Sequence, residues 1–156
     1  MLSYKLLFFL PLISTIFTYP FGVLLGEKTA QYFSSTLISI AAILSWFLFI
    51  SFSSSSSSEI IIPVLEWFFV SGQFFNWGIS VNSITLLMLK LVLKVSALVH
   101  IYSIEYMSHD NSKVRFMTYL SLFTFCMVAL VVSDNLIQLF FGWEGVGLAS
   151  YLLIGF

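Results

Sequence analysis

The sequence predicts an all-α, polytopic membrane protein with about five transmembrane helices. Of its 156 residues, 60% are hydrophobic and only 8% are charged, whereas soluble domains are about 45–50% apolar and about 25% charged. Apolar runs of roughly 20 residues, long enough to cross about 30 Å of hydrocarbon, recur along the chain. This composition excludes a soluble globular enzyme. The net charge of −1 leaves no basic surface for nucleic acid.

The first two predicted helices span residues 5–26 and 33–52. The first contains Pro11 and Pro20, and a single Lys ahead of an apolar run also resembles a secretory signal peptide. No small-residue cleavage pattern follows, however, and the run is long enough to span a membrane. The second helix carries no charge, and the Ser run over 53–58 that follows it predicts a flexible connector.

Residues 59–82 interrupt the helical pattern. They contain Pro63, Gly72 and Gly78 among β-branched and aromatic residues, a composition that favours a hairpin around Gly72. Their aromatic side chains suit the membrane–water interface. We therefore expect a short interfacial hairpin between the second and third helices.

Three further helices are predicted over 83–107, 116–132 and 136–156. The most polar stretch of the chain, residues 109–113, marks the turn between the first two of them. The polar turn before the last helix contains Asp134, which is expected either to cap that helix or to lie at a proton entrance. The five helices are expected to form a single membrane domain.

The distribution of basic residues predicts the orientation. Five spans place the loops over 27–32 and 108–115 on one side of the membrane, with three basic residues: Lys28, Lys113 and Arg115. The other side carries only Lys5. By the positive-inside rule, the first side faces the matrix or cytoplasm, and the N-terminus faces outward.

Glu144 is the leading candidate for chemistry, because an ionised group at mid-depth costs about 2.5–3.5 kcal/mol even on the lenient insertion scale. It lies nine residues after Asn135, which at about 1.5 Å per residue is near mid-membrane. We expect its carboxyl group to relay protons; the alternative is a protonated carboxyl hydrogen-bonded to a neighbouring helix. Small residues flank it and favour close approach of another helix: Gly142, Gly145, Gly147 and Ala149.

Lys90 and Lys94 lie four residues apart on one face of the third helix, and Glu105 lies close to the same face. This stripe is expected to face protein or water rather than lipid. Both residues are candidates for a proton path, and Lys94 is expected to have a carboxylate partner. The alternative is that Lys90 extends its ammonium group to the interface and Lys94 pairs with a carboxylate for structure alone.

His100 points to a different side of the third helix. As a single His it is expected either to be a hydrogen-bonded packing residue or to belong to a proton relay. Cys126 is the only cysteine, which excludes a disulfide framework and a zinc site built from Cys within the chain. It is expected to pack as a small hydrophobe.

Four strings in the second half of the chain are distinctive: residues 96–107 (SALVHIYSIEYM), 115–125 (RFMTYLSLFTF), 133–135 (SDN) and 142–147 (GWEGVG). In their order and spacing they resemble the NADH dehydrogenase subunit 5 family, the distal antiporter-like membrane subunits of respiratory complex I. The resemblance covers most of this chain but only the N-terminal portion of the family's chain.

The resemblance implies a proton-translocating subunit within an antiporter-like helix bundle, in which Glu144 of the Trp-Glu-Gly motif is the first buried acid. It implies no redox cofactor in this chain; FMN, iron–sulfur clusters and ubiquinone belong elsewhere in the enzyme, NADH:ubiquinone reductase. Expected partners are lipid, other membrane subunits of complex I and a companion chain carrying the family's remaining helices. The sequence departs from the family pattern at two places. Asn82 stands where the family usually has an acid, and Lys90 and Lys94 stand where it usually has apolar residues.

Two other functions stay open at this stage. One is a fragment of the large subunit of a multi-subunit cation/proton antiporter, which shares much of the same motif. The other is a structural membrane subunit whose helices only brace the assembly. A composition rich in Phe and Ser is compatible with an A+T-rich organellar genome, so the expected location is the mitochondrial inner membrane, with a bacterial plasma membrane as the alternative.

Overall fold

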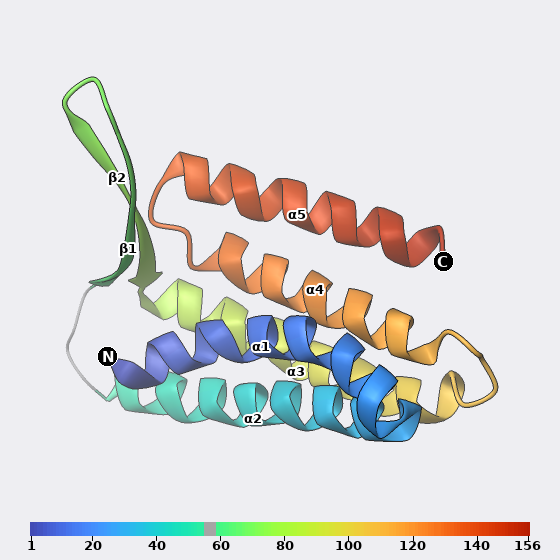
Figure 1. Cartoon of the computed structure of the whole chain (residues 1–156). Coiled ribbons are helices and arrows are strands. Elements are labelled where there is room, and N and C mark those ends of the chain that lie inside the picture. The colour runs from blue at the N-terminus through green and yellow to red at the C-terminus, as the bar shows by residue number, and fades with distance from the viewer. Residues whose placement is uncertain (55–58) are drawn as a thin grey trace.

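The structure, a computed structural model, describes residues 1–54 and 59–156 and confirms the predicted class. Five helices are long and apolar enough to cross a membrane, and a hairpin separates the second from the third (Figure 1). The elements are α1 (Leu2–Leu25), α2 (Glu27–Ser53), β1 (Ile60–Val70), β2 (Gln73–Val81), α3 (Ser83–Tyr106), α4 (Lys113–Val131) and α5 (Leu136–Ile154). Of the connector predicted over 53–58, residues 55–58 lie outside the described residues.

The turn between α1 and α2 is tighter than the sequence predicts. A loop is expected over 27–32, whereas α2 already begins at Glu27 and only Gly26 separates the two helices. Gly26 has a φ of +99°, in the region that glycine adopts without steric strain. Pro11 and Pro20 lie inside α1 without ending it, because membrane helices tolerate proline.

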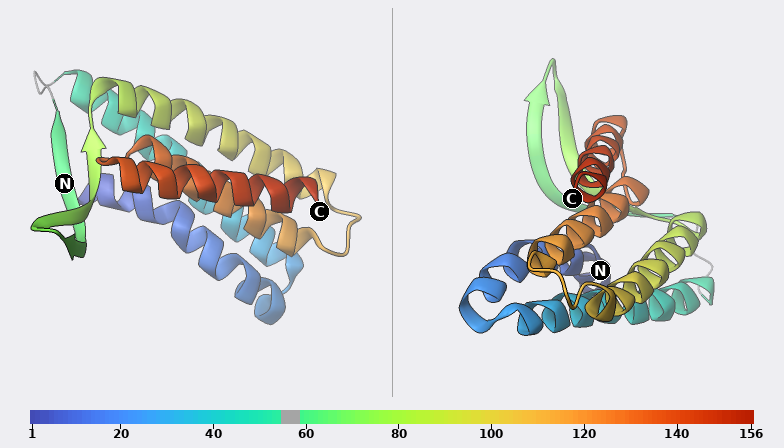
Figure 2. Two further views of the ribbon diagram at one scale, coloured as in Figure 1. Left: turned by 90° about the horizontal axis from the view of Figure 1, so that it is seen from above. Right: turned by 90° about the vertical axis from the view of Figure 1, so that its right-hand side faces the viewer.

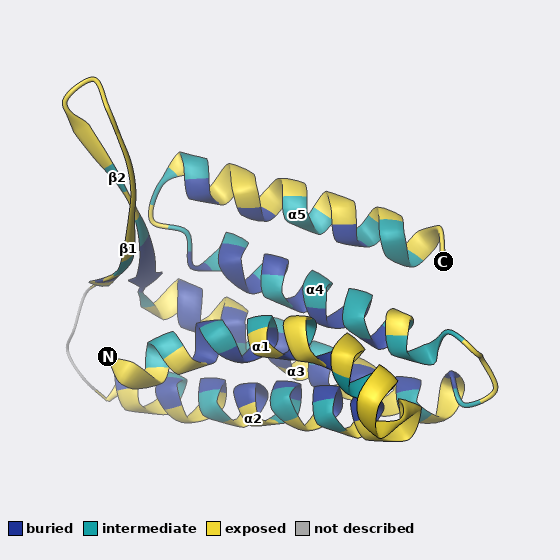
Figure 3. Cartoon of the chain, viewed as in Figure 1, coloured by how far each residue is buried: buried dark blue, intermediate teal, exposed yellow. Residues whose placement is uncertain are grey.

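The first four helices form the core of the protein. Within this bundle α1 packs against α2 and α4, and α2 packs against α3. The end-on view in Figure 2 shows α5 outside this group, beside α4. As a result α5 is the least buried of the five spans, and its side facing away from α4 is exposed (Figure 3).

The predicted hairpin is confirmed, although its strands are longer than expected. β1 and β2 pair antiparallel across a turn formed by Ser71 and Gly72. Both turn residues have positive φ, +53° and +85°, as a two-residue turn of type I′ requires. At the base of the hairpin Ile62 and Ile79 are buried in the core, whereas the aromatic tip is exposed.

Gln138 anchors the hairpin to the start of α5. Its amide Oε1 accepts from the N–H of Gly78 at 3.2 Å, and its Nε2 donates to the carbonyl oxygen of Gly78 at 2.9 Å. The cap of α5 is Asn135, whose side chain accepts from the backbone N–H of Gln138 at 2.9 Å. The prediction that Asp134 caps this helix is therefore wrong: Asn135 has the extended backbone that a cap needs, and Asp134 lies beside Gly78 instead.

Candidate functional site

Glu144 lies near the middle of α5. It follows Leu136, the first residue of the helix, by eight residues, which is about 12 Å along the axis at about 1.5 Å per residue. The sequence predicts a buried acid here, but the side chain is exposed. Within residues 1–54 and 59–156, no cation forms an ion pair with its carboxylate. The chain thus places this acid near the middle of an apolar helix without burying it.

Small residues bring α5 against α4. A Cβ atom at Gly142 would lie 2.7 Å from the backbone N of Leu130, and one at Gly145 would lie 2.7 Å from Sγ of Cys126. The predicted close approach of another helix is confirmed at these two positions. A Cβ atom at Gly147 would meet nothing within 4 Å. This residue therefore lies on the exposed side of α5 that faces away from α4, which we call the open side of α5. Cys126 is buried, as its expected packing role requires.

The ammonium groups of Lys90 and Lys94 lie against aromatic side chains of α2. Nζ of Lys90 is 4.4 Å from the ring centroid of Trp46 and 4.0 Å from that of Phe49. Nζ of Lys94 is 5.8 Å from the centroid of Trp46. Each such contact contributes about 0.5–1 kcal/mol when exposed and about 2 kcal/mol when desolvated. Among the described residues neither Lys forms an ion pair, and the expected carboxylate partner of Lys94 is not found there.

His100 is fully buried and hydrogen-bonds within the bundle. Its Nδ1 lies 2.8 Å from the carbonyl oxygen of Ser96, and its Nε2 lies 3.2 Å from Oγ of Ser121. Oγ of Ser121 is 2.8 Å from Oγ of Ser34 and 2.9 Å from Oγ of Ser14. Ser14 also donates to Ser34 at 3.1 Å.

We call Ser14, Ser34 and Ser121 the hydroxyl triangle. They come from α1, α2 and α4, and all three are fully buried. Together with His100 on α3 they join four helices through hydrogen bonds between side chains. These serines are not among the candidate residues that the sequence predicts. Each is a hydroxyl residue within an otherwise apolar span. This feature alone does not indicate a site, because many membrane helices carry such residues for packing.

The predicted candidates do not converge on one site. Glu144 lies on the open side of α5, His100 inside the bundle, and Lys90 and Lys94 beside α2. Asp134 is exposed beside Gly78 of the hairpin. Across the described ranges, no group of three His, Cys, Asp or Glu side chains is placed to hold a metal ion.

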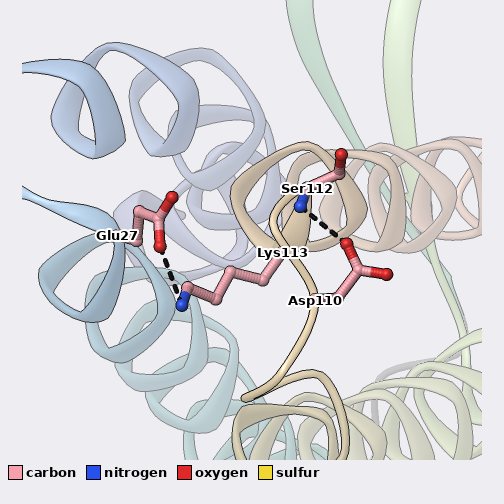
Figure 4. Close-up of polar contacts among 4 residues, drawn as sticks. All are labelled: Glu27, Asp110, Ser112 and Lys113. Carbon is pink, nitrogen blue, oxygen red and sulfur yellow. Dashed lines mark hydrogen bonds and ion pairs between the residues drawn. The ribbon is translucent and has the colours of Figure 1, made fainter.

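An ion pair that the sequence analysis missed closes the end of the bundle opposite the hairpin. Nζ of Lys113 lies 2.7 Å from a carboxylate oxygen of Glu27 and ties the start of α4 to the start of α2 (Figure 4). In the same turn, Asp110 Oδ1 accepts from the backbone N–H of Ser112 at 2.6 Å, which stabilises the predicted turn over 109–113. Because the Glu27 side chain is 48% exposed, the pair contributes at most about 1 kcal/mol.

Comparisons with known proteins show which proteins this sequence is similar to. Residues 67–117 match the family described as NADH-Ubiquinone oxidoreductase (complex I), chain 5 N-terminus. The chain is 46% identical over 140 residues to NADH-quinone oxidoreductase subunit L of Rhodobacter capsulatus, covering 85% of this chain and 19% of that protein. It is 44% identical over 155 residues to NADH-ubiquinone oxidoreductase chain 5 of Arabidopsis thaliana, covering 98% of this chain and 23% of the relative.

A third relative, NADH-quinone oxidoreductase subunit L of Rickettsia conorii, is 44% identical over 147 residues, which is 94% of this chain and 22% of that protein. The chain therefore spans about a fifth of the length of these relatives. The similarity runs through all five helices and the hairpin rather than through one motif. On this basis the chain is similar to the N-terminal portion of proteins named NADH-ubiquinone oxidoreductase chain 5 and NADH-quinone oxidoreductase subunit L.

Proposed function

We propose that this chain is the N-terminal part of the distal proton-translocating membrane subunit of respiratory complex I. In that role it couples electron transfer from NADH to ubiquinone with proton pumping. The observation that carries the proposal is Glu144, a carboxyl group near the middle of an apolar helix, because ionisable residues inside a membrane are retained for function. The names of the relatives, subunits of NADH-quinone and NADH-ubiquinone oxidoreductases, support it.

The open side of α5, its side facing away from α4, is proposed to be covered by further helices of the same subunit. Around Glu144 it presents large apolar side chains: Leu136, Leu139, Phe140, Trp143, Leu148 and Tyr151. Lipid would satisfy these side chains, but an ionised carboxylate facing lipid at mid-depth costs about 2.5–3.5 kcal/mol. Covering helices would remove this cost by supplying a cation. Movement of that cation would then drive proton uptake or release by Glu144.

We propose that three further residues take part in proton movement around Glu144: Lys90, Lys94 and Asp134. The two ammonium groups, held over Trp46, are placed to pair with carboxylates of neighbouring helices. Asp134 is exposed at the end of the bundle that carries the hairpin, where a proton could enter or leave. The opposite end carries Lys28, Lys113 and Arg115 and is proposed to face the matrix.

We propose the mitochondrial inner membrane as the location and lipid and the other membrane subunits of complex I as partners. This chain is proposed to hold no redox cofactor, so that FMN, the iron–sulfur clusters and ubiquinone are bound by other subunits. Its contribution to the enzyme is then proton movement rather than electron transfer.

Purification of the tagged chain from its native membrane in mild detergent tests this assignment. Copurification of flavin and iron–sulfur subunits with NADH-oxidising activity is the expected result. Copurification with antiporter subunits and no flavin would identify the cation/proton antiporter instead.

A further inference from the structure

We propose that His100 and the hydroxyl triangle form a buried proton-loading site inside the α1–α4 bundle, separate from Glu144. A proton delivered to the triangle would be held on Nε2 of His100 and later returned. This inference rests on the proposed function, because a loading site has a use only in a subunit that moves protons. It starts from the hydrogen bonds, which determine where each proton of the group lies.

The ring nitrogen Nδ1 of His100 carries a proton. It lies 2.8 Å from the carbonyl oxygen of Ser96, and a carbonyl oxygen can only accept a hydrogen bond. In the neutral ring Nε2 is therefore an acceptor, and the hydroxyl group of Ser121, 3.2 Å away, donates to it. No charged side chain of the described residues hydrogen-bonds the imidazole or the triangle.

This tautomer sets the direction of the remaining bonds. Since the Ser121 proton points to Nε2, Ser34 donates to Ser121 at 2.8 Å, and Ser14 donates to Ser34 at 3.1 Å. The result is a chain of donors that ends on a basic nitrogen. Ser14 also lies 2.9 Å from Ser121, so the triangle offers a second, shorter path to the same nitrogen.

A protonated water that donates to the outer end of the chain would load the site. Each hydroxyl proton shifts to the next oxygen, and the proton of Ser121 forms a bond to Nε2 of His100. The imidazole becomes an imidazolium, every serine again holds one proton, and the donors now point the opposite way. No other bond changes, and unloading reverses the steps. The hydroxyl triangle therefore satisfies both protonation states of His100.

A polar path towards the matrix end leads away from the triangle. Gln31 lies one turn from Ser34 on α2 and is 3% exposed, and its buried Nε2 has no hydrogen-bond partner among the described residues. Such an orphaned buried donor marks a place for an internal water. Gln31 also lines a pocket of about 170 Å³ together with charged and polar side chains: Lys28, Tyr32, Glu105, Ser108 and Lys113. This pocket is the proposed mouth of the path.

The test measures protons translocated per electron transferred, in vesicles that contain the whole complex, with each result normalised to the amount of assembled complex. Ser121→Ala removes the only hydroxyl of the triangle that reaches Nε2 and should lower this ratio. Ser34→Ala should lower it less, because the contact between Ser14 and Ser121 bypasses Ser34. The matched control is Ser45→Ala on α2: Ser45 is equally buried but donates only to the carbonyl oxygen of Ala42 in its own helix, so the ratio should stay unchanged.

Two results would overturn the proposal. One is an equal ratio in the assembled Ser121→Ala and Ser45→Ala complexes. The other is a Ser121→Ala variant that lowers the amount of assembled complex but leaves the ratio unchanged. If Ser121→Ala does not assemble, Ser121→Cys keeps a side chain of similar size with a much weaker donor and should give the same fall. Glu144→Gln in the same vesicles separates the two claims. A low ratio there with a normal ratio in Ser121→Ala would refute the loading site and leave the proposed function standing.

Discussion

Replacing Gly142 with Ala should force α5 away from α4. The new Cβ atom would lie 2.7 Å from both the backbone N and the Cα of Leu130, whereas carbon atoms pack best at about 3.5–4.0 Å. The helices therefore need to separate by roughly 1 Å, because backbone atoms cannot rotate aside as a flexible side chain can. Overpacking of this kind costs about 1–3 kcal/mol.

A gain in helix propensity partly offsets this cost. Ala is more favourable than Gly in a helix by about 0.8–1.0 kcal/mol, so the net destabilisation by Gly142→Ala is about 0–2 kcal/mol. Gly147→Ala is the matched control, since its Cβ atom would meet nothing within 4 Å in this chain. The propensity gain is common to both variants, so within this chain they differ by the overpacking cost at Gly142, about 1–3 kcal/mol.

The assay heats the purified assembly and follows the temperature at which this chain leaves the soluble fraction. Gly142→Ala should lower the midpoint relative to Gly147→Ala. A midpoint for Gly142→Ala at or above that of Gly147→Ala would refute the close packing of α4 and α5. It would also leave the exposed position of Glu144 unexplained, because the contact at Gly142 is what turns Glu144 away from the bundle.

Three further outcomes are expected. Cysteine placed at Ser112 should resist an impermeant thiol reagent added from the outer side, because the positive-inside rule places this turn in the matrix; labelling from outside would reverse the orientation. Gln138→Leu leaves the N–H and carbonyl groups of Gly78 without their partner, at about 1–3 kcal/mol for each buried group, so protease should cleave the hairpin faster; unchanged cleavage would contradict the anchor. A structure of the whole assembly should show a carboxylate beside Lys94, and an ammonium group surrounded by lipid would contradict that pairing.

The number and order of the elements could be predicted from the sequence. Hydrocarbon thickness sets the length of an apolar span, and the helix boundaries lie within three residues of the predicted ones except at the start of α2. That exception has a physical reason. Glu27 looks like a loop residue in the sequence, but its carboxylate pairs with Lys113. Lys113 is 86 positions away, so no local sequence pattern predicts this pair.

The faces of the helices could not be predicted. The apolar spans are hydrophobic on all sides, so their sequences do not indicate which side meets a neighbour. The hydroxyl triangle exists only because α1, α2 and α4 turn Ser14, Ser34 and Ser121 towards one point. Likewise, the close contact at Gly142 determines the rotation of α5 and leaves Glu144 on its open side.

The ratio of protons translocated to electrons transferred by complex that carries Glu144→Gln tests the central claim most directly. Gln keeps the size and much of the hydrogen bonding of Glu but cannot titrate. The control is Glu66→Gln in the exposed part of the hairpin, where the same chemical change lies outside the spans. We predict a lower ratio for Glu144→Gln and an unchanged one for Glu66→Gln, with full assembly of both. A normal ratio in fully assembled Glu144→Gln complex would contradict the account and leave Glu144 as a packing residue.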